Sequence, residues 1–301
     1  MTATPAARAT QHSDQHRRMS AQRAALHVFL IAISCVWLFP LVWAVYTALR
    51  PYGETARLGY ISFGGTYNLD NFIHAWTQAE LPHYYLNTLI IAIPAMFLVL
   101  LFASMVAFAV SRYSWRFNLV LLMLFTAGNL LPQQVVIVPL YKIYLSLPLP
   151  SFLNDKGHMY DSYLGIILIH VAFQLGFCTF VLSNFMKTIP KELNEAAVVD
   201  GANVWTTYLR VILPLTRPAM AALATLQFTW IYNDFFWAYL LMGTGSKLPI
   251  TSAISNLKGQ FFVDNNLLAA GSLLVALPTL IVYFALQKHF VAGLTLGSTK
   301  G

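Results

Sequence analysis

Charged residues are scarce in this chain, and their scarcity excludes an ordinary soluble domain. Asp, Glu, Lys and Arg make up 10% of the 301 residues, whereas hydrophobic residues make up 58%. A soluble domain usually carries about 25% charged residues. Because lipid disfavours charge and tolerates apolar side chains, the composition predicts a protein embedded in a membrane.

Cysteine is nearly absent, and no set of side chains has a usable catalytic or metal-binding spacing. Cys35 and Cys178 each lie inside an apolar run and are expected to pack as small hydrophobic residues. Segment 243–247 superficially resembles a phosphate loop, but it lacks the four-residue gap before Gly-Lys-Ser/Thr. We therefore expect no catalytic residue, no metal and no ATP site in this chain.

Six long apolar stretches are present, and each has the roughly 20 residues that a membrane-spanning helix needs. Backbone polar groups in lipid must be hydrogen-bonded within their own segment, which favours helices. The polar residues 1–24 before the first stretch are expected to be disordered. The predicted spans are residues 25–49, 85–110, 118–145, 162–185, 218–242 and 267–287.

The distribution of lysine and arginine predicts the orientation of these spans. Twelve of the eighteen basic residues lie in the segments on the same side as the N-terminal region, and the other six lie in the alternate loops. Since positive charge collects on the cytoplasmic side, both termini are expected in the cytoplasm. The sequence therefore predicts a multi-pass protein of the bacterial inner or plasma membrane, with residues 290–301 as a cytoplasmic tail.

The cytoplasmic loop 188–214 has the pattern of two short helices joined at a glycine. Pro190 suits a first helical turn, Glu192 follows near the helix start, and Gly201 is a natural C-terminal stop. Ala196 and Ala197 leave little bulk on the surface, and acidic residues flank them. Small side chains allow another backbone to approach, and a carboxylate can pair with arginine across such a contact. The loop therefore predicts a rigid knob that inserts into a partner protein.

The same loop resembles the signature of bacterial binding-protein-dependent ABC permeases. The matched positions are Glu195, Ala196, Ala197, Gly201, Val211, Leu213 and Pro214. The C-terminal segment 287–301 and the segment Trp230–Trp237 are similar to the maltose-type, MalG-like sugar permeases, and Pro132, Pro139 and Tyr141 agree with them. The resemblance covers residues 25–301.

The resemblance implies an all-α MetI-like bundle with an additional N-terminal helix, acting as one subunit of an ATP-driven sugar importer. Its partners would be a second, non-identical permease, an ATPase dimer that binds ATP and Mg, and an extracytoplasmic solute-binding protein. The positions implied to contact the ATPase are Glu195, Ala196, Ala197, Asp200, Gly201, Leu213 and Pro214, together with Thr295, Gly297 and Lys300 in the tail.

Several polar residues inside the spans are candidates for a translocation path. Asp234 is the one acid within a predicted span, so it should face a cavity or a partner. A structural hydrogen bond is the alternative for Asp234, and contact between helices is the alternative for the amides. His170 and Gln174 are expected to be packing residues. The path candidates are Asn129, Gln133, Trp230, Asn233 and Asp234.

Two other functions remain open from the sequence. The same subfamily could import a glycerol-phosphate-type or another small polar solute. A secondary transporter would need inverted repeats and ion ligands within the membrane, and the sequence offers only Asp234 and no repeat.

Overall fold

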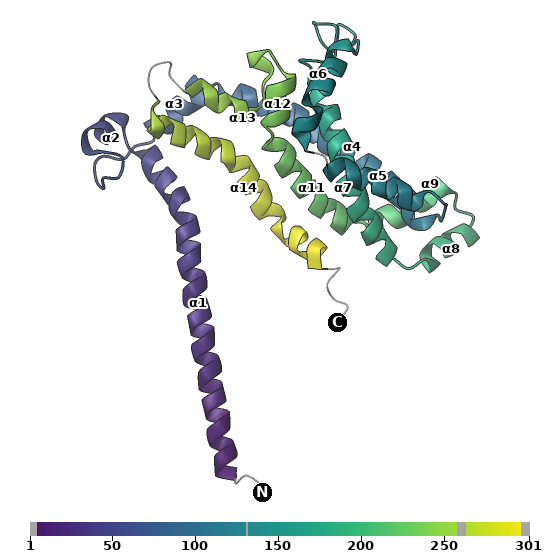
Figure 1. Ribbon diagram of the computed structural model, residues 1–301, viewed down its shortest axis with the longest axis horizontal. Helices are drawn as coiled ribbons and strands as arrows, with labels where there is room; N and C mark the ends of the chain where they lie inside the picture. Colours follow the sequence, from purple (N-terminus) through teal and green to yellow (C-terminus); the bar gives the residue numbers. More distant parts are fainter. Residues whose placement is uncertain (1–4, 131, 258–262, 296–301) are drawn as a thin grey trace.

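The computed structural model describes residues 5–130, 132–257 and 263–295, and within these ranges the chain is helical (Figure 1). The only β-type pairing there is an isolated bridge between Pro148 and His158. The predicted all-α fold is confirmed. Within the described residues, four helices are long and apolar enough to cross a membrane, and the number rises to six if each of two bent helix pairs counts as one span.

The first helix, α1 (Pro5–Leu49), stands apart from the rest of the bundle along most of its length (Figure 1). Its apolar residues from Leu26 to Val42 are largely exposed, and Ala48 near its end is the first residue packed in a core cluster. The prediction that residues 1–24 are disordered does not match this helix, which starts at Pro5. Residues 6–39 contain neither Pro nor Gly and include several Ala, Gln and Arg residues, so nothing interrupts the helix.

Two long helices that run parallel to each other form the centre of the bundle: α4 (Leu81–Arg112) and α7 (Tyr163–Thr188). Ala95, Ala103 and Ala107 of α4 are fully buried, as is Cys178 of α7. Small side chains allow two helices to approach closely in a membrane, where packing rather than water drives association. Against this pair lie α5 (Asn118–Leu130) and α11 (Arg217–Tyr232), and α14 (Asn265–Thr295) packs on α11.

Two of the predicted spans are broken rather than straight. In the third, α5 is followed by the short η1 (Gln133–Val136) and α6 (Ile137–Ser146), at an angle of 88°. Pro132 caps η1 and lacks the N–H that would continue the helix. In the fifth, α11 ends at Tyr232 and α12 (Phe236–Leu241) begins after three intervening residues.

The two ends of the bundle differ. One end, which we call the α13 end, contains α2 (Tyr52–Leu58), α3 (Asp70–Gln78), η3 (Gly245–Lys247), α13 (Ile250–Ala253) and η4 (Ile254–Leu257). At the opposite, α8 end lie α8 (Glu192–Val199), α9 (Val204–Thr206), η2 (Thr207–Ile212) and α10 (Leu213–Leu215) (Figure 1).

Candidate coupling loop and solute cavity

Helix α8 ends in a geometry that only glycine adopts easily. Gly201 has φ +78°, the N–H of Gly201 donates to the carbonyl of Val198 at 3.0 Å, and the N–H of Ala202 donates to that of Ala197 at 2.9 Å. This is a Schellman motif, which satisfies carbonyls that the helix end would leave unpaired. The predicted helix–glycine–helix loop is therefore present, and Gly201 fixes the angle between its two parts.

The exposed surface of α8 carries acidic side chains next to apolar ones. Glu195, Ala196 and Asp200 are exposed, and Val198 and Val199 beside them are 59% and 86% exposed. Ala197, which the sequence grouped with the contact surface, faces inward and is 8% exposed. Exposed valines next to carboxylates are unusual on a solvated helix, and they suit a site that another protein covers.

The second part of the loop runs directly into a spanning helix. Asn203 caps α9, because its side-chain oxygen accepts the N–H of Thr206 at 2.9 Å. Leu213 and Pro214 are half-buried in α10, at the junction with α11, away from the exposed face of α8. The first matched part of the motif, residues 195–201, thus lies on the knob, and the second part, Leu213 and Pro214, lies where the loop joins α11.

The loop is tied to the core by side chains that the sequence did not single out. The hydroxyl of Tyr208 in η2 lies 2.7 Å from the hydroxyl of Ser104 in α4, and both residues are buried. Arg112, at the end of α4, donates to the carbonyls of Met186 at 2.9 Å and Ile189 at 3.1 Å, where α7 leads into the loop. The knob is therefore attached to three helices, α4, α7 and α11.

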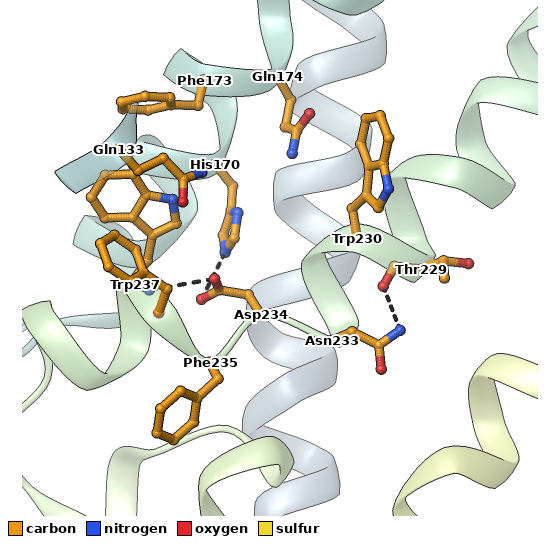
Figure 2. A pocket seen from close by; sticks show the side chains of 11 residues that line it. Gln133, His170, Phe173, Gln174, Thr229, Trp230, Asn233, Asp234, Phe235 and Trp237 are labelled. Carbon is orange, nitrogen blue, oxygen red and sulfur yellow. Dashed lines mark hydrogen bonds and ion pairs between the residues drawn. The ribbon is translucent and has the colours of Figure 1, made fainter. Parts of the chain in front are cut away.

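A cavity of about 660 Å³ opens where the third and fifth spans are broken. It receives Gln133 from η1 and His170, Phe173 and Gln174 from α7, together with residues 229–230 of α11 and residues 233–237 from the break to the start of α12 (Figure 2). The predicted path residues Gln133, Trp230, Asn233 and Asp234 are brought together here. Asn129 lies in α5, but its side chain is outside the described part of the structure.

Asp234 makes structural hydrogen bonds and also lines the cavity, which are the two alternatives that the sequence left open. Its two carboxylate oxygens accept the N–H groups of Trp237 and Ala238, each at 3.3 Å, so it caps α12. Its backbone carbonyl accepts the hydroxyl of Thr251 at 2.6 Å, which fixes the break to α13. It also lies on the cavity wall, with Oδ2 3.7 Å from Nε2 of His170 (Figure 2).

His170 is packed in the interior, as expected, and it also faces Asp234. The residue is 4% exposed, and its Nε2 has no hydrogen-bond partner in the described structure. Sequence spacing could not reveal the pair, because 64 positions separate His170 from Asp234 and neither forms a motif with its neighbours. The described parts of the chain contain no group of three His, Cys, Asp or Glu side chains that could hold a metal ion.

The fold and the two sites define a multi-pass membrane bundle with a cavity at the breaks of two spans and a knob at one end. Residues 99–295 match the family model of the binding-protein-dependent transport system inner membrane component. That match covers more than half of the sequence, and the chain belongs to this family of ABC importer permeases.

Curated relatives agree over nearly the whole chain. The diacetylchitobiose uptake system permease NgcG of Streptomyces coelicolor is 29% identical, over 98% of this chain and 93% of its own. A probable ABC transporter permease of Pyrococcus horikoshii is 32% identical over 87% and 92%. The melibiose/raffinose/stachyose import permease MelC of Bacillus subtilis is 28% identical over 89% and 94%.

A solved structure has the same fold. It is a chain of a bacterial ABC transporter involved in the import of the acidic polysaccharide alginate, with a TM-score of 0.75 and 19% identity, and the alignment covers 92% of this chain and 98% of that one. The predicted MetI-like permease fold is thereby confirmed. Of the tail residues, Thr295 is the last of α14, whereas Gly297 and Lys300 lie outside the described residues.

Proposed function

We propose that this chain is the membrane-spanning permease subunit of an ATP-driven importer for a di- or oligosaccharide. The observation that carries the proposal is the continuous connection from the exposed knob α8, through η2 and α10, to α11, whose far end lines the cavity. The names of the relatives support a sugar, since they import diacetylchitobiose or melibiose and raffinose.

Other subunits supply what this chain is proposed to lack. An ATPase dimer binds ATP and Mg, a second, non-identical permease completes the pathway, and an extracytoplasmic binding protein delivers the sugar. The α8 end and both termini face the cytoplasm, in agreement with the excess of lysine and arginine there. The surface formed by Glu195, Ala196, Asp200 and the exposed valines inserts into the ATPase. The C-terminal tail, with Thr295, Gly297 and Lys300, approaches the ATPase dimer.

Movement of the knob is the proposed source of alternating access. When the ATPase dimer closes, it displaces α8, and the attached helices α4, α7 and α11 move as a unit. The break between α11 and α12 lies at the other end of that unit and faces the cavity, so a rigid rotation there changes which side of the cavity is open. Rigid-body motion of packed helices around a fixed site is the common physical basis of such transport.

Reversal of the charge at Glu195 tests the coupling role. Glu195→Lys should leave membrane insertion unchanged but reduce co-purification of the ATPase by about tenfold, because an exposed carboxylate that pairs with a basic residue becomes repulsive. Glu192→Lys, on the same helix and also exposed, is the matched control and should retain the ATPase.

Deletion of residues 295–301 tests the tail contact. In an ATP hydrolysis assay of the purified complex, the deletion should weaken stimulation by the loaded binding protein. Normal ATPase recovery with Glu195→Lys would reject the coupling surface, and unchanged stimulation after the deletion would reject the tail contact.

A further inference from the structure

The carboxylate of Asp234 is held loosely for a buried acid. The N–H groups of Trp237 and Ala238 lie 3.3 Å from its carboxylate oxygens, the N–H of Phe236 also faces them, and Nε2 of His170 lies 3.7 Å away. Hydrogen bonds from a backbone N–H to an oxygen are usually about 2.9–3.0 Å long, and a carboxylate offers about four acceptor positions. Part of the accepting capacity of Asp234 is therefore left for a molecule in the cavity.

His170 has a matching deficit. Its Nε2 is buried without a hydrogen-bond partner, and Asp234 is the polar group that faces it (Figure 2). Leaving a buried polar atom unpaired costs about 1–3 kcal/mol. The two side chains face each other at 3.7 Å without a hydrogen bond between them. A hydroxyl group that enters the cavity can donate a hydrogen bond to the carboxylate of Asp234 and give Nε2 of His170 a partner.

The rest of the wall matches an uncharged, hydroxylated ring. Of the 11 described residues that line the cavity, none is Lys or Arg, so no fixed positive charge is available for an anion. Gln133, Gln174 and Asn233 supply amides, which both donate and accept. Trp230 is 43% exposed and presents an indole face, whose negative quadrupole attracts the polarised C–H groups of a sugar ring. The volume of about 660 Å³ is within the usual range of small-molecule sites.

We propose that this cavity is a binding site for uncharged sugars in this subunit, in which Asp234, positioned by His170, accepts hydrogen bonds from sugar hydroxyl groups and repels anionic solutes. The inference rests on the proposed function and adds to it the charge class of the solute and the residues that select it. It also assigns solute contact to this subunit, where the carboxylate excludes acidic sugars and phosphorylated compounds by desolvation and like-charge repulsion.

The test uses the complete permease–ATPase complex in nanodiscs, without the binding protein, and measures binding by calorimetry. The probes are melibiose and diacetylchitobiose as neutral disaccharides and digalacturonate as an anionic disaccharide. At least one neutral disaccharide should bind the unmodified complex, and digalacturonate should not. Absence of binding by both neutral sugars, or equal binding of digalacturonate, would overturn the assignment.

Variants then identify the residues. Asp234→Asn keeps one carbonyl oxygen to cap α12 but removes the charge, and this variant should raise the Kd for the neutral sugar at least tenfold. His170→Phe keeps a ring and should raise the same Kd by a smaller factor. Asp264→Asn is the matched control, because Asp264 caps α14 through the N–H groups of Asn266 and Leu267, remote from the cavity, and its Kd should not change. An unchanged Kd in Asp234→Asn would overturn the proposal.

Failure of this inference can be told apart from failure of the proposed function. ATP-dependent uptake of the same sugars is measured in proteoliposomes with the binding protein present. Uptake that is normal in both the unmodified complex and Asp234→Asn would retain the importer and reject the site. Absence of any ATP-dependent sugar uptake would reject the importer itself, whatever the calorimetry shows.

Discussion

At the scale of single residues, Asp161 is the most heavily bonded acid at the α13 end. It adopts φ +61° and is fully buried. Its carboxylate accepts the N–H groups of Gly243 and Thr244 at 2.8 and 2.9 Å and the hydroxyl of Thr244 at 2.6 Å, and it pairs with Lys156 at 2.5 Å. One side chain therefore joins the loop before α7 to the loop after α12.

These contacts determine the titration of Asp161. Burial by itself raises the pKa of its carboxyl, but the hydrogen bonds from Lys156, from the hydroxyl and N–H of Thr244 and from the N–H of Gly243 outweigh burial and lower the pKa to about 2. A lowered pKa in the folded state means that the stabilisation is present above about pH 4 and is lost as the pH falls towards 2.

Asp161→Asn should therefore lower the free energy of unfolding by about 1.5–3 kcal/mol at neutral pH, because hydrogen bonds to a charged acceptor are replaced by weaker ones. Asparagine tolerates the left-handed backbone, so the change removes charge without adding strain. Thermal unfolding in detergent measures the effect, and the difference from the unmodified protein should shrink between pH 4 and pH 2. Asp155→Asn, on the exposed loop nearby, is the control. A difference that stays constant over this range would contradict the assignment.

At the scale of elements, the glycine after α8 determines the direction of the knob. An added Cβ at Gly201 would meet no atom within 4 Å, so any effect of alanine there comes from the backbone alone. Gly201→Ala should destabilise the loop by about 1–2 kcal/mol, the cost of a left-handed conformation for a residue with a Cβ. ATP hydrolysis that depends on the binding protein should fall, whereas insertion should not.

Gly53→Ala provides the comparison for that experiment. Gly53 lies in α2, also with no atom within 4 Å of an added Cβ, but without a positive φ. Alanine favours a helix by roughly 1 kcal/mol over glycine, so this variant should be neutral or slightly more stable. Equal losses of coupling in the two variants would show that the backbone geometry at Gly201 is not what positions the knob.

The elements also show which features a sequence can predict. The spans followed from length and hydropathy, since lipid requires about 20 apolar residues whatever their partners are. The end of the knob helix followed from Gly201, whose backbone freedom is local, whereas Pro190 lies before α8 rather than in its first turn. The pairing of His170 with Asp234, the contacts of Asp161 and the inward direction of Ala197 depend on segments far apart in the chain, so no local pattern could predict them. The structure extends α1 back to Pro5 because no Pro or Gly interrupts residues 6–39, although the composition of residues 5–24 is polar.

At the scale of the whole molecule, the two ends of the bundle should lie on opposite sides of the membrane. Val198 on the knob and Phe152 in the loop after α6 are 59% and 83% exposed. In a Cys35→Ser background, Val198→Cys should react with an impermeant maleimide only after the cells are opened. Phe152→Cys should react in intact cells. Labelling of Val198→Cys from outside intact cells would reverse the orientation and remove the basis for an ATPase contact.

The isolation of α1 has a consequence for how the protein is made. Every backbone hydrogen bond of an α-helix is internal, so a spanning helix is stable in lipid before any neighbour arrives. In the described structure, α1 contacts the remainder of the chain mainly near Ala48, at its C-terminal end. It can therefore enter the bilayer first and hold the nascent chain there while the broken, polar-containing segments are still being synthesised, and only afterwards do the later helices assemble beside it.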